Sequence, residues 1–91
     1  MWVDEIELRL MSADLVVVRR EEMADLDWEC VAITVPSEPL PLAPVHLVMD
    51  DLLSGRQFHG DAVVVRSDEQ RHVFRGGGAL GGIHPADGLD P

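Results

Sequence analysis

The side chains of this sequence that could take part in the most kinds of chemistry are four histidines and the carboxylates near two of them. Imidazole and carboxylate groups bind transition metals and exchange protons near neutral pH. Successive histidines are 12 or 13 residues apart, at His46, His59, His72 and His84. A metal site built on one element uses histidines only about two to four residues apart. These histidines can therefore form a site only if neighbouring strands bring them together.

The turn signal Ser54-Gly55 indicates how two strands could do so. A two-residue turn places Asp50 opposite His59 and sets the histidines and carboxylates of both strands on one face. The same pattern is typical of a solvent-exposed strand face, and a shift of one residue in register reverses every assignment. The sequence predicts no catalytic residue, no metal and no other cofactor. It offers one candidate ligand-binding set: His46, Asp50, His59, Asp61 and His72.

A glycine-rich run near the C-terminus matches the spacing G-x-G-x-x-G of dinucleotide-binding loops, since residues 76–81 read GGGALG. Such a loop binds pyrophosphate because a helix begins there and directs its N–H groups at the ligand. Here glycine and proline continue to residue 91, which is unfavourable for a helix. We therefore interpret residues 76–91 as a flexible Gly/Pro-rich tail after a single domain formed by residues 1–75.

The one cysteine and the serines lack the partners that nucleophilic catalysis requires. Cys30 has no basic neighbour in sequence to lower its pKa, and strand alternation places it with Trp28 and Ala32. We expect it to be a small packed side chain. None of the four serines lies in the G-x-S-x-G motif of a nucleophile elbow.

Composition excludes several classes of partner. Of the 91 residues, 17 are Asp or Glu and seven are Arg, with no Lys, which gives a formal charge of −10. Such a surface repels nucleic-acid phosphates and anionic lipid headgroups, so we expect no nucleic-acid and no membrane partner. The acidic start of the chain does not resemble a signal peptide, and a single cysteine cannot form an internal disulfide, so we expect a cytoplasmic protein.

Alternating and β-branched runs predict strands in the first third of the chain. Residues 5–11 alternate apolar and charged side chains, and residues 15–20 are rich in Val. A turn at Ser12-Ala13 would join them as a hairpin. Alternatively, Asp14 could cap a helix running to Leu26, so residues 14–26 can be strand or helix.

The remaining strands are predicted from apolar runs between turn signals. They cover residues 29–35, 45–49, 57–66 and 72–74, and a proline-rich extended crossover fills residues 36–44. A two-residue loop in the last hairpin would pair Val63 with Phe74 and Val65 with His72. With the hairpin above, this predicts an all-β fold, with one short helix at most, arranged as a small six-stranded antiparallel barrel or sandwich.

Two functions from different classes fit these features. The first is a noncatalytic protein-interaction or accessory module, acting on a protein partner or as a homodimer. It would use an exposed strand edge or a patch around Trp2, Trp28 and residues 40–42. The alternative is a small-ligand- or metal-binding β-barrel whose site includes His46, His59, Asp61 and His72.

Overall fold

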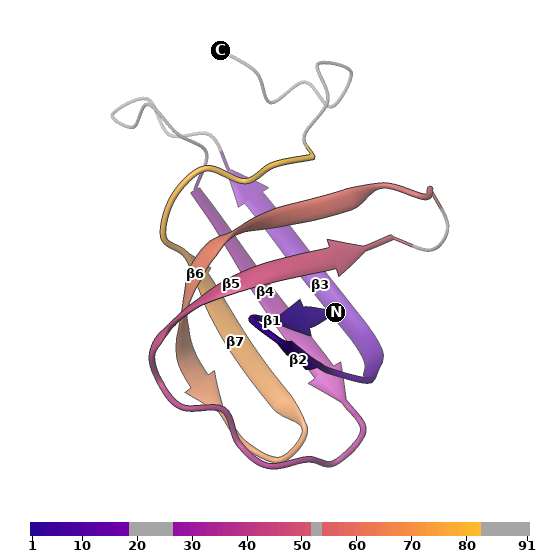
Figure 1. Ribbon diagram of the computed structural model, residues 1–91, viewed down its shortest axis with the longest axis vertical. Helices are drawn as coiled ribbons and strands as arrows, with labels where there is room; N and C mark the ends of the chain where they lie inside the picture. The colour runs from indigo at the N-terminus through magenta and orange to yellow at the C-terminus, as the bar shows by residue number, and fades with distance from the viewer. Residues whose placement is uncertain (19–26, 52–53, 83–91) are drawn as a thin grey trace.

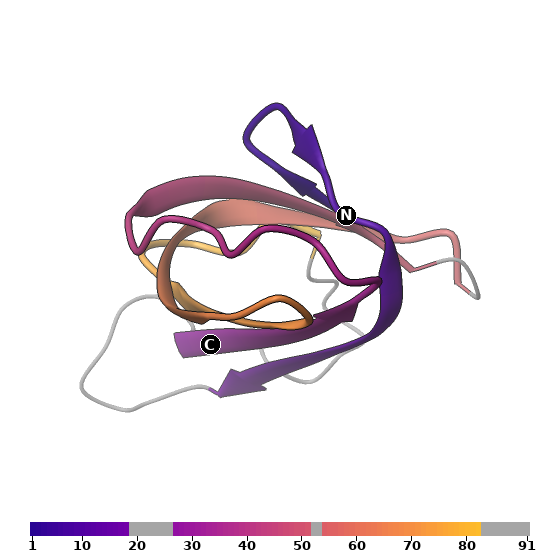
Figure 2. The ribbon, with the colours of Figure 1, turned by 90° about the horizontal axis from the view of Figure 1, so that it is seen from below.

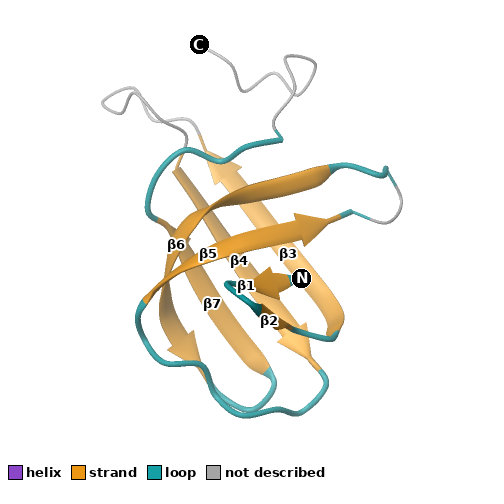
Figure 3. Ribbon diagram, in the orientation of Figure 1, coloured by secondary structure: helices purple, strands orange, loops and turns teal. Residues whose placement is uncertain are grey.

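The computed structural model describes residues 1–18, 27–51 and 54–82, and all of the regular structure in these ranges is β-strand. Figures 1 and 3 show the strands in the same orientation. They are Trp2–Val3 (β1), Ile6–Glu7 (β2), Leu10–Val18 (β3), Asp27–Thr34 (β4), Pro44–Asp50 (β5), Gln57–Ser67 (β6) and Arg71–Gly76 (β7). The predicted all-β class is confirmed.

The strands form one antiparallel sheet in the order β2-β1-β5-β6-β7-β4-β3. The sheet bends back over itself, so that β5 and the first part of β6 cross in front of β3 and β4 (Figures 1 and 2). The long strand β6 belongs to both layers, because its first half pairs with β5 and its second half with β7. The core lies between the two layers.

Alternation along β4 defines one wall of this core. Trp28, Cys30, Ala32 and Thr34 are buried, while the side chains between them are partly or fully exposed. The facing strand β6 contributes small residues, Gly60 and Ala62 among them, where it passes over the indole of Trp28. Large side chains on one layer thus oppose small ones on the other, as close packing requires.

The indole of Trp28 lies in a slot made of backbone. A methyl group added at Gly60 would lie 3.0 Å from the indole, and one added at Gly76 would collide with it. The indole Nε1 donates a hydrogen bond to the carbonyl oxygen of Gly78 at 3.0 Å, which satisfies its only polar group. This bond ties the chain after β7 to β4.

The turn between β6 and β7 is held by a carboxylate. Oδ1 of Asp68 accepts hydrogen bonds from the backbone N–H groups of Gln70 (2.8 Å) and Arg71 (2.7 Å). These bonds stabilise the ionised form, and they lower the pKa of Asp68 below its ordinary value. The carboxylate thus satisfies two backbone N–H groups of the turn, as a capping side chain does at the N-terminus of a helix.

The predicted hairpin with a turn at Ser12-Ala13 is wrong. Residues 10–18 form one continuous strand, β3, which pairs with β4, and the register shifts between Leu10 and Ser12. The N-terminal turn comes earlier, where Asp4 has a positive φ of 52° between β1 and β2. Asp tolerates this left-handed conformation better than most residues, whereas Ser12-Ala13 offers no residue suited to it. Of residues 14–26, positions 14–18 are strand and positions 19–26 lie outside the described residues.

The predicted pairing of the last hairpin is wrong. Val64 and not Val63 lies opposite Phe74, and Ser67 and not Val65 lies opposite His72, so the register differs by one residue at Phe74 and by two at His72. The register shift between Val64 and Arg66 leaves Val65 as an additional residue on β6. A bulge of this kind increases local twist, which suits the strand that passes from one layer to the other.

The chain continues to pack against the sheet beyond the predicted domain boundary at residue 75. Leu80 is buried in the core, and the backbone of Gly81 forms two hydrogen bonds with that of His59, of 2.7 and 3.2 Å. Residues 76–82 are therefore part of the packed domain. Residues 83–91, including His84, lie outside the part of the chain that the structure describes.

The sheet has seven strands instead of the expected six, and it does not close into a barrel. Its two ends, β2 and β3, are not hydrogen-bonded to each other as strands. Among the described residues there is no helix of the length and hydropathy needed to cross a membrane.

We expect Gly76→Ala to lower the free energy of unfolding by about 1–3 kcal/mol, because the added methyl group overpacks the slot of Trp28. Gly78→Ala is the matched control, since nothing lies within 4 Å of its added methyl group. Its effect should stay within about 0.5 kcal/mol. Urea denaturation followed by tryptophan fluorescence measures both. Equal stability of the two variants would contradict the tight packing of the indole.

Candidate functional site

His46 and Asp61 lie directly opposite each other on β5 and β6. The Nδ1 atom of His46 is 2.9 Å from Oδ1 of Asp61, and both side chains are largely exposed, at 51% and 80%. The backbone N–H of His46 also donates to Oδ1 of Asp4 at 2.8 Å, an interaction that the sequence pattern did not indicate. The pair is an ion pair only when His46 is protonated.

The other predicted members of the set do not complete a site. The rings of His59 and His46 have their centroids 6.5 Å apart, and the ring of His59 lies where a methyl group on Gly81 would be. Asp50 lies opposite Gln57 and not His59, and it accepts a hydrogen bond from the Gln57 amide at 3.0 Å. It is four residues from His46, or about 13 Å along the strand.

The loop between β5 and β6 explains this difference. The backbone N–H of Asp51 donates to the carbonyl oxygen of Arg56, so the loop is longer than the two residues Ser54-Gly55. The register differs from the expected one by two residues, which preserves the face of each side chain and changes its partner. Within the described ranges no three metal-binding side chains lie close enough to hold a metal ion.

His72 lies on the opposite face of the sheet and is completely buried. Its Nδ1 atom is 2.6 Å from Oγ of Ser67, and its Nε2 atom is 3.1 Å from Oγ1 of Thr34. The Ser67 hydroxyl also accepts a hydrogen bond from the N–H of Leu40 at 2.7 Å, while Thr34 Oγ1 donates to the carbonyl oxygen of Gln70 at 3.4 Å. The sequence pattern does not indicate this cluster, because Ser67 lies just beyond the predicted strand of residues 57–66.

One tautomer satisfies the whole cluster. With the proton of a neutral His72 on Nε2, that atom donates to Thr34, and Nδ1 accepts from the hydroxyl of Ser67. A second proton on Nδ1 would remove this acceptor. Burial lowers the pKa of His72, an effect that the negative charge of Asp68 partly opposes. The geometry and the pKa both favour the neutral ring.

The contact between Ser67 and His72 has the form of a nucleophile and its base, but its surroundings are those of a structural cluster. The Ser67 oxygen already accepts the Leu40 N–H, and the imidazole has no exposed surface. A general base must reach the reacting group of a substrate, which the buried ring cannot do here. The cluster joins the proline-rich crossover to strands β4, β6 and β7.

Cys30 is also buried, as its predicted position beside Trp28 and Ala32 implied. Burial, together with the negative charge of Asp14, raises the pKa of the thiol to about 11. The thiolate form that nucleophilic chemistry requires is therefore disfavoured at neutral pH. The role of Cys30 is packing.

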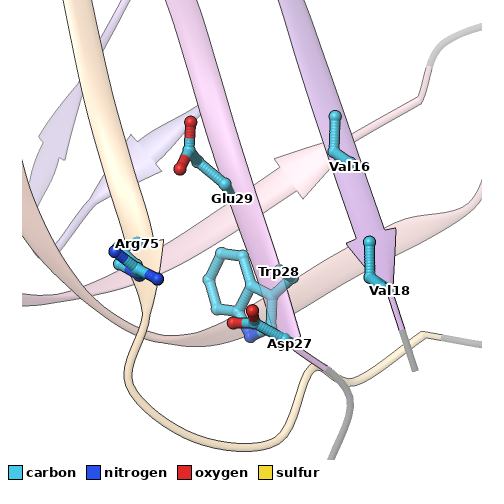
Figure 4. A pocket seen from close by; sticks show the side chains of 6 residues that line it. All are labelled: Val16, Val18, Asp27, Trp28, Glu29 and Arg75. Atoms are coloured by element: carbon cyan, nitrogen blue, oxygen red, sulfur yellow. The ribbon is translucent and has the colours of Figure 1, made fainter. Parts of the chain in front are cut away.

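A shallow pocket of about 230 Å³ lies at one end of β3 and β4 (Figure 4). Glu29 and Arg75 face each other there on adjacent strands. Because residues 19–26 connect the two strands at this end and lie outside the described residues, we assign no site to this pocket. Its lining residues are Val16, Val18, Asp27, Trp28, Glu29 and Arg75.

A larger and more apolar groove of about 520 Å³ lies between β3 and the end of the β5–β6 hairpin that carries the connecting loop. Leu15 and Cys30 form one wall, and Met49 and Phe58 form the other. Asp50 and Asp51 are the acidic residues of the lining, and none of the described residues that line it is basic, although the guanidinium of Arg56 lies over the ring of Phe58. The other lining residues are Leu10, Met11, Ser12 and Ala13.

The strand β3 beside this groove is a sheet edge. It pairs with β4 on one side and with no other strand of the described part of the chain. Four of the ten large hydrophobic side chains that are exposed in the described ranges lie on it: Leu10, Met11, Val16 and Val18. Of the expected patch around Trp2, Trp28 and residues 40–42, Trp2 is 42% and Leu42 is 67% exposed, whereas Trp28 is buried. An exposed strand edge, the other expected feature, is present at β3 within the described residues.

We expect the stability of the protein to fall as the pH falls below about 6.5, the ordinary pKa of histidine. His72 has a lowered pKa in the folded protein, so the unfolded chain binds the proton first and the free energy of unfolding decreases. Above that pH the contribution is fully present. Urea denaturation at pH 7.5 and 5.5 measures the difference, which should shrink in His72→Gln and persist in the exposed-site control His46→Ala.

If His72→Gln does not fold, an NMR titration of the imidazole signals of the unmodified protein tests the same point. Titration of His72 at or above about 6.5 would contradict the neutral buried ring.

We expect the His46–Asp61 contact to contribute only about 0.2–1 kcal/mol to stability, because both side chains are exposed. The coupling energy from a double-mutant cycle with His46→Ala and Asp61→Ala measures it. A coupling well above about 1 kcal/mol would show that the pair is structurally important.

Comparisons with protein-family models, with curated proteins and with solved structures give no match for this chain. Its function is therefore argued from its own residues. The strongest feature for that purpose is the free edge of β3 with the adjoining apolar groove.

Proposed function

We propose that this chain is a small noncatalytic interaction module that recognises a protein partner through the free edge of β3. The observation that carries the proposal is the nine-residue length of this edge strand, lying beside a mostly apolar groove. An unpaired strand edge presents a row of N–H and C=O groups to which an extended segment can add as a further strand. Affinity then comes from the backbone, and specificity comes from the groove.

The distribution of polar groups supports a binding role over a catalytic one. The Ser67, His72 and Thr34 side chains are engaged in one buried cluster, and the thiol of Cys30 is buried. These groups are the nucleophile and base types that an enzyme of this size would need at its surface. The groove beside β3 is lined mostly by apolar side chains, with Ser12, Asp50 and Asp51 as its polar residues, and the edge of β3 is unpaired within the described residues.

A ligand role for the exposed His46–Asp61 pair is the alternative. It rests on the 2.9 Å contact and on the nearby ring of His59. A rise in melting temperature with zinc that disappears in His46→Ala would support it, because a ligand that binds only the native state stabilises that state.

The test of the proposed function is selection of peptides about as long as β3 from a random displayed library by the immobilised protein. We expect the selected peptides, added to ¹⁵N-labelled protein, to shift the amide signals of β3 more than those of β1 and β2. Ala13→Arg, which places a long side chain in the groove, should reduce their affinity roughly tenfold. Leu42→Arg changes an exposed apolar residue outside the groove and is the matched control.

Two results would overturn this proposal. One is selection of peptides that shift the amide signals of another surface. The other is equal affinity of the Ala13→Arg and Leu42→Arg variants.

A further inference from the structure

The two faces of β3 carry different side chains, and these determine which residues an added strand would need on each face. Ala13 and Leu15 lie opposite Ala32 and Cys30, on the face that turns toward the groove. Asp14 lies between them and opposite Val31, on the outer face. Because side chains alternate along a strand, an added strand would direct every second residue into the groove and the others toward Asp14.

The groove favours apolar side chains at the positions of an added strand that point into it. Met49 is 7% exposed, and Phe58 is partly buried against the core, so their free surfaces form the far wall. Side chains inserted there would contact Leu15 on the near wall. Burial of such side chains contributes about 25 cal/mol for each Å² of apolar surface removed from water.

The exposed carboxylate of Asp14 favours a basic residue at the neighbouring outer position of an added strand, beside the exposed apolar Val16 and Val18 of the same face. Asp14 is the middle residue of β3 and is exposed, and Asp50 stands exposed at the rim on the opposite side. Burial raises the pKa of the Cys30 thiol, and the nearby charge of Asp14 adds to this effect. Among the described residues that line the groove none is basic, but the guanidinium of Arg56 lies 4.9 Å from the ring centroid of Phe58, so one positive charge adjoins the far wall. Opposite charges on paired strands stabilise the pairing.

The same charges disfavour a second copy of this chain. Antiparallel pairing of two β3 strands about their midpoint would set Asp14 directly opposite Asp14 of the other copy, and like charges in that position are destabilising. Each copy also carries a formal charge of −10. An inward or central charge on an edge strand is a common means of preventing self-association.

We infer that the groove beside β3 binds an extended segment of another protein in which apolar residues alternate with lysine or arginine. The segment adds as a strand to the free edge of β3. Its apolar side chains contact Leu15, Met49 and Phe58, and a basic side chain lies next to Asp14. This inference rests on the proposed function and specifies the chemistry of the partner.

Three synthetic peptides of equal length test the inference by fluorescence anisotropy at about 0.15 M salt, where long-range attraction between exposed charges is largely screened. The first alternates Val and Arg, the second alternates Val and Glu, and the third contains the residues of the first in blocks. We expect the alternating Val/Arg peptide to bind and to shift the amide signals of β3. The block peptide should bind roughly tenfold more weakly, because it cannot direct all its Val residues to one face.

Variants that remove single carboxylates test which of them the basic side chains of the peptide contact. Asp14→Asn and Asp50→Asn should each weaken binding of the Val/Arg peptide about two- to fivefold, the range of an exposed ion pair. Glu38→Gln is the matched control, since Glu38 is exposed and does not line the groove. Its affinity should be unchanged.

The outcomes separate this inference from the proposed function. Equal or tighter binding of the Val/Glu peptide at β3 would overturn the basic partner and leave the interaction module intact. So would a dimer in sedimentation equilibrium whose β3 amides are protected from exchange. Absence of any shift in β3 with all three peptides and with library-selected peptides would overturn both.

Discussion

The burial of the Trp28 indole is the constraint on which the rest of this fold depends. The flat ring lies against the backbone of Gly60 on the facing strand β6 and of Gly76 on the neighbouring strand β7, where a side chain would crowd or collide with it. Its one polar atom must also find an acceptor, which is the carbonyl oxygen of Gly78. Truncation of a buried tryptophan typically costs about 3–5 kcal/mol, a large part of the stability of a small domain. The glycine-rich run after β7 is thus a packing element.

This arrangement also determines where the sheet ends. The two layers come together around Trp28, and the chain after β7 reaches back to pair Gly81 with His59 beside β6. That contact is made at the edge of β6 that does not pair with β5. At the other end of the molecule, the short hairpin of β1 and β2 pairs only with β5 and does not extend to β3. Consequently β3 keeps one unpaired edge within the described part of the chain, and the space next to it is the apolar groove.

The sequence was sufficient for some features and insufficient for others, for physical reasons. Apolar runs between turn signals located β5, β6 and β7, and alternation placed Cys30 with Trp28 on a buried face. The partner of β3 could not be predicted, because the pairing of residues 10–18 with β4 is decided by long-range packing and not by the local pattern. The additional residue at Val65 could not be predicted either, because such a bulge accompanies the local twist of the strand. The bulge in turn decides which residue lies opposite His72. Alternation correctly placed His46 and Asp61 on one face, whereas their direct contact required the true length of the β5–β6 loop.

The separation of reactive groups from exposed surface is the strongest argument about function. A small sheet has few positions for a buried polar cluster, and this one uses them for Thr34, Ser67 and His72, whose hydrogen bonds hold the crossover against the sheet. Polar side chains that satisfy one another in this way gain stability and lose reactivity, because each donor and acceptor is already engaged. The surface of the described residues retains acidic side chains, the exposed His46–Asp61 pair, an apolar groove and the unpaired edge of β3. The groove and the edge suit the proposed recognition by backbone and shape, and the carboxylate of Asp14 at the middle of β3 would give that recognition a preferred charge.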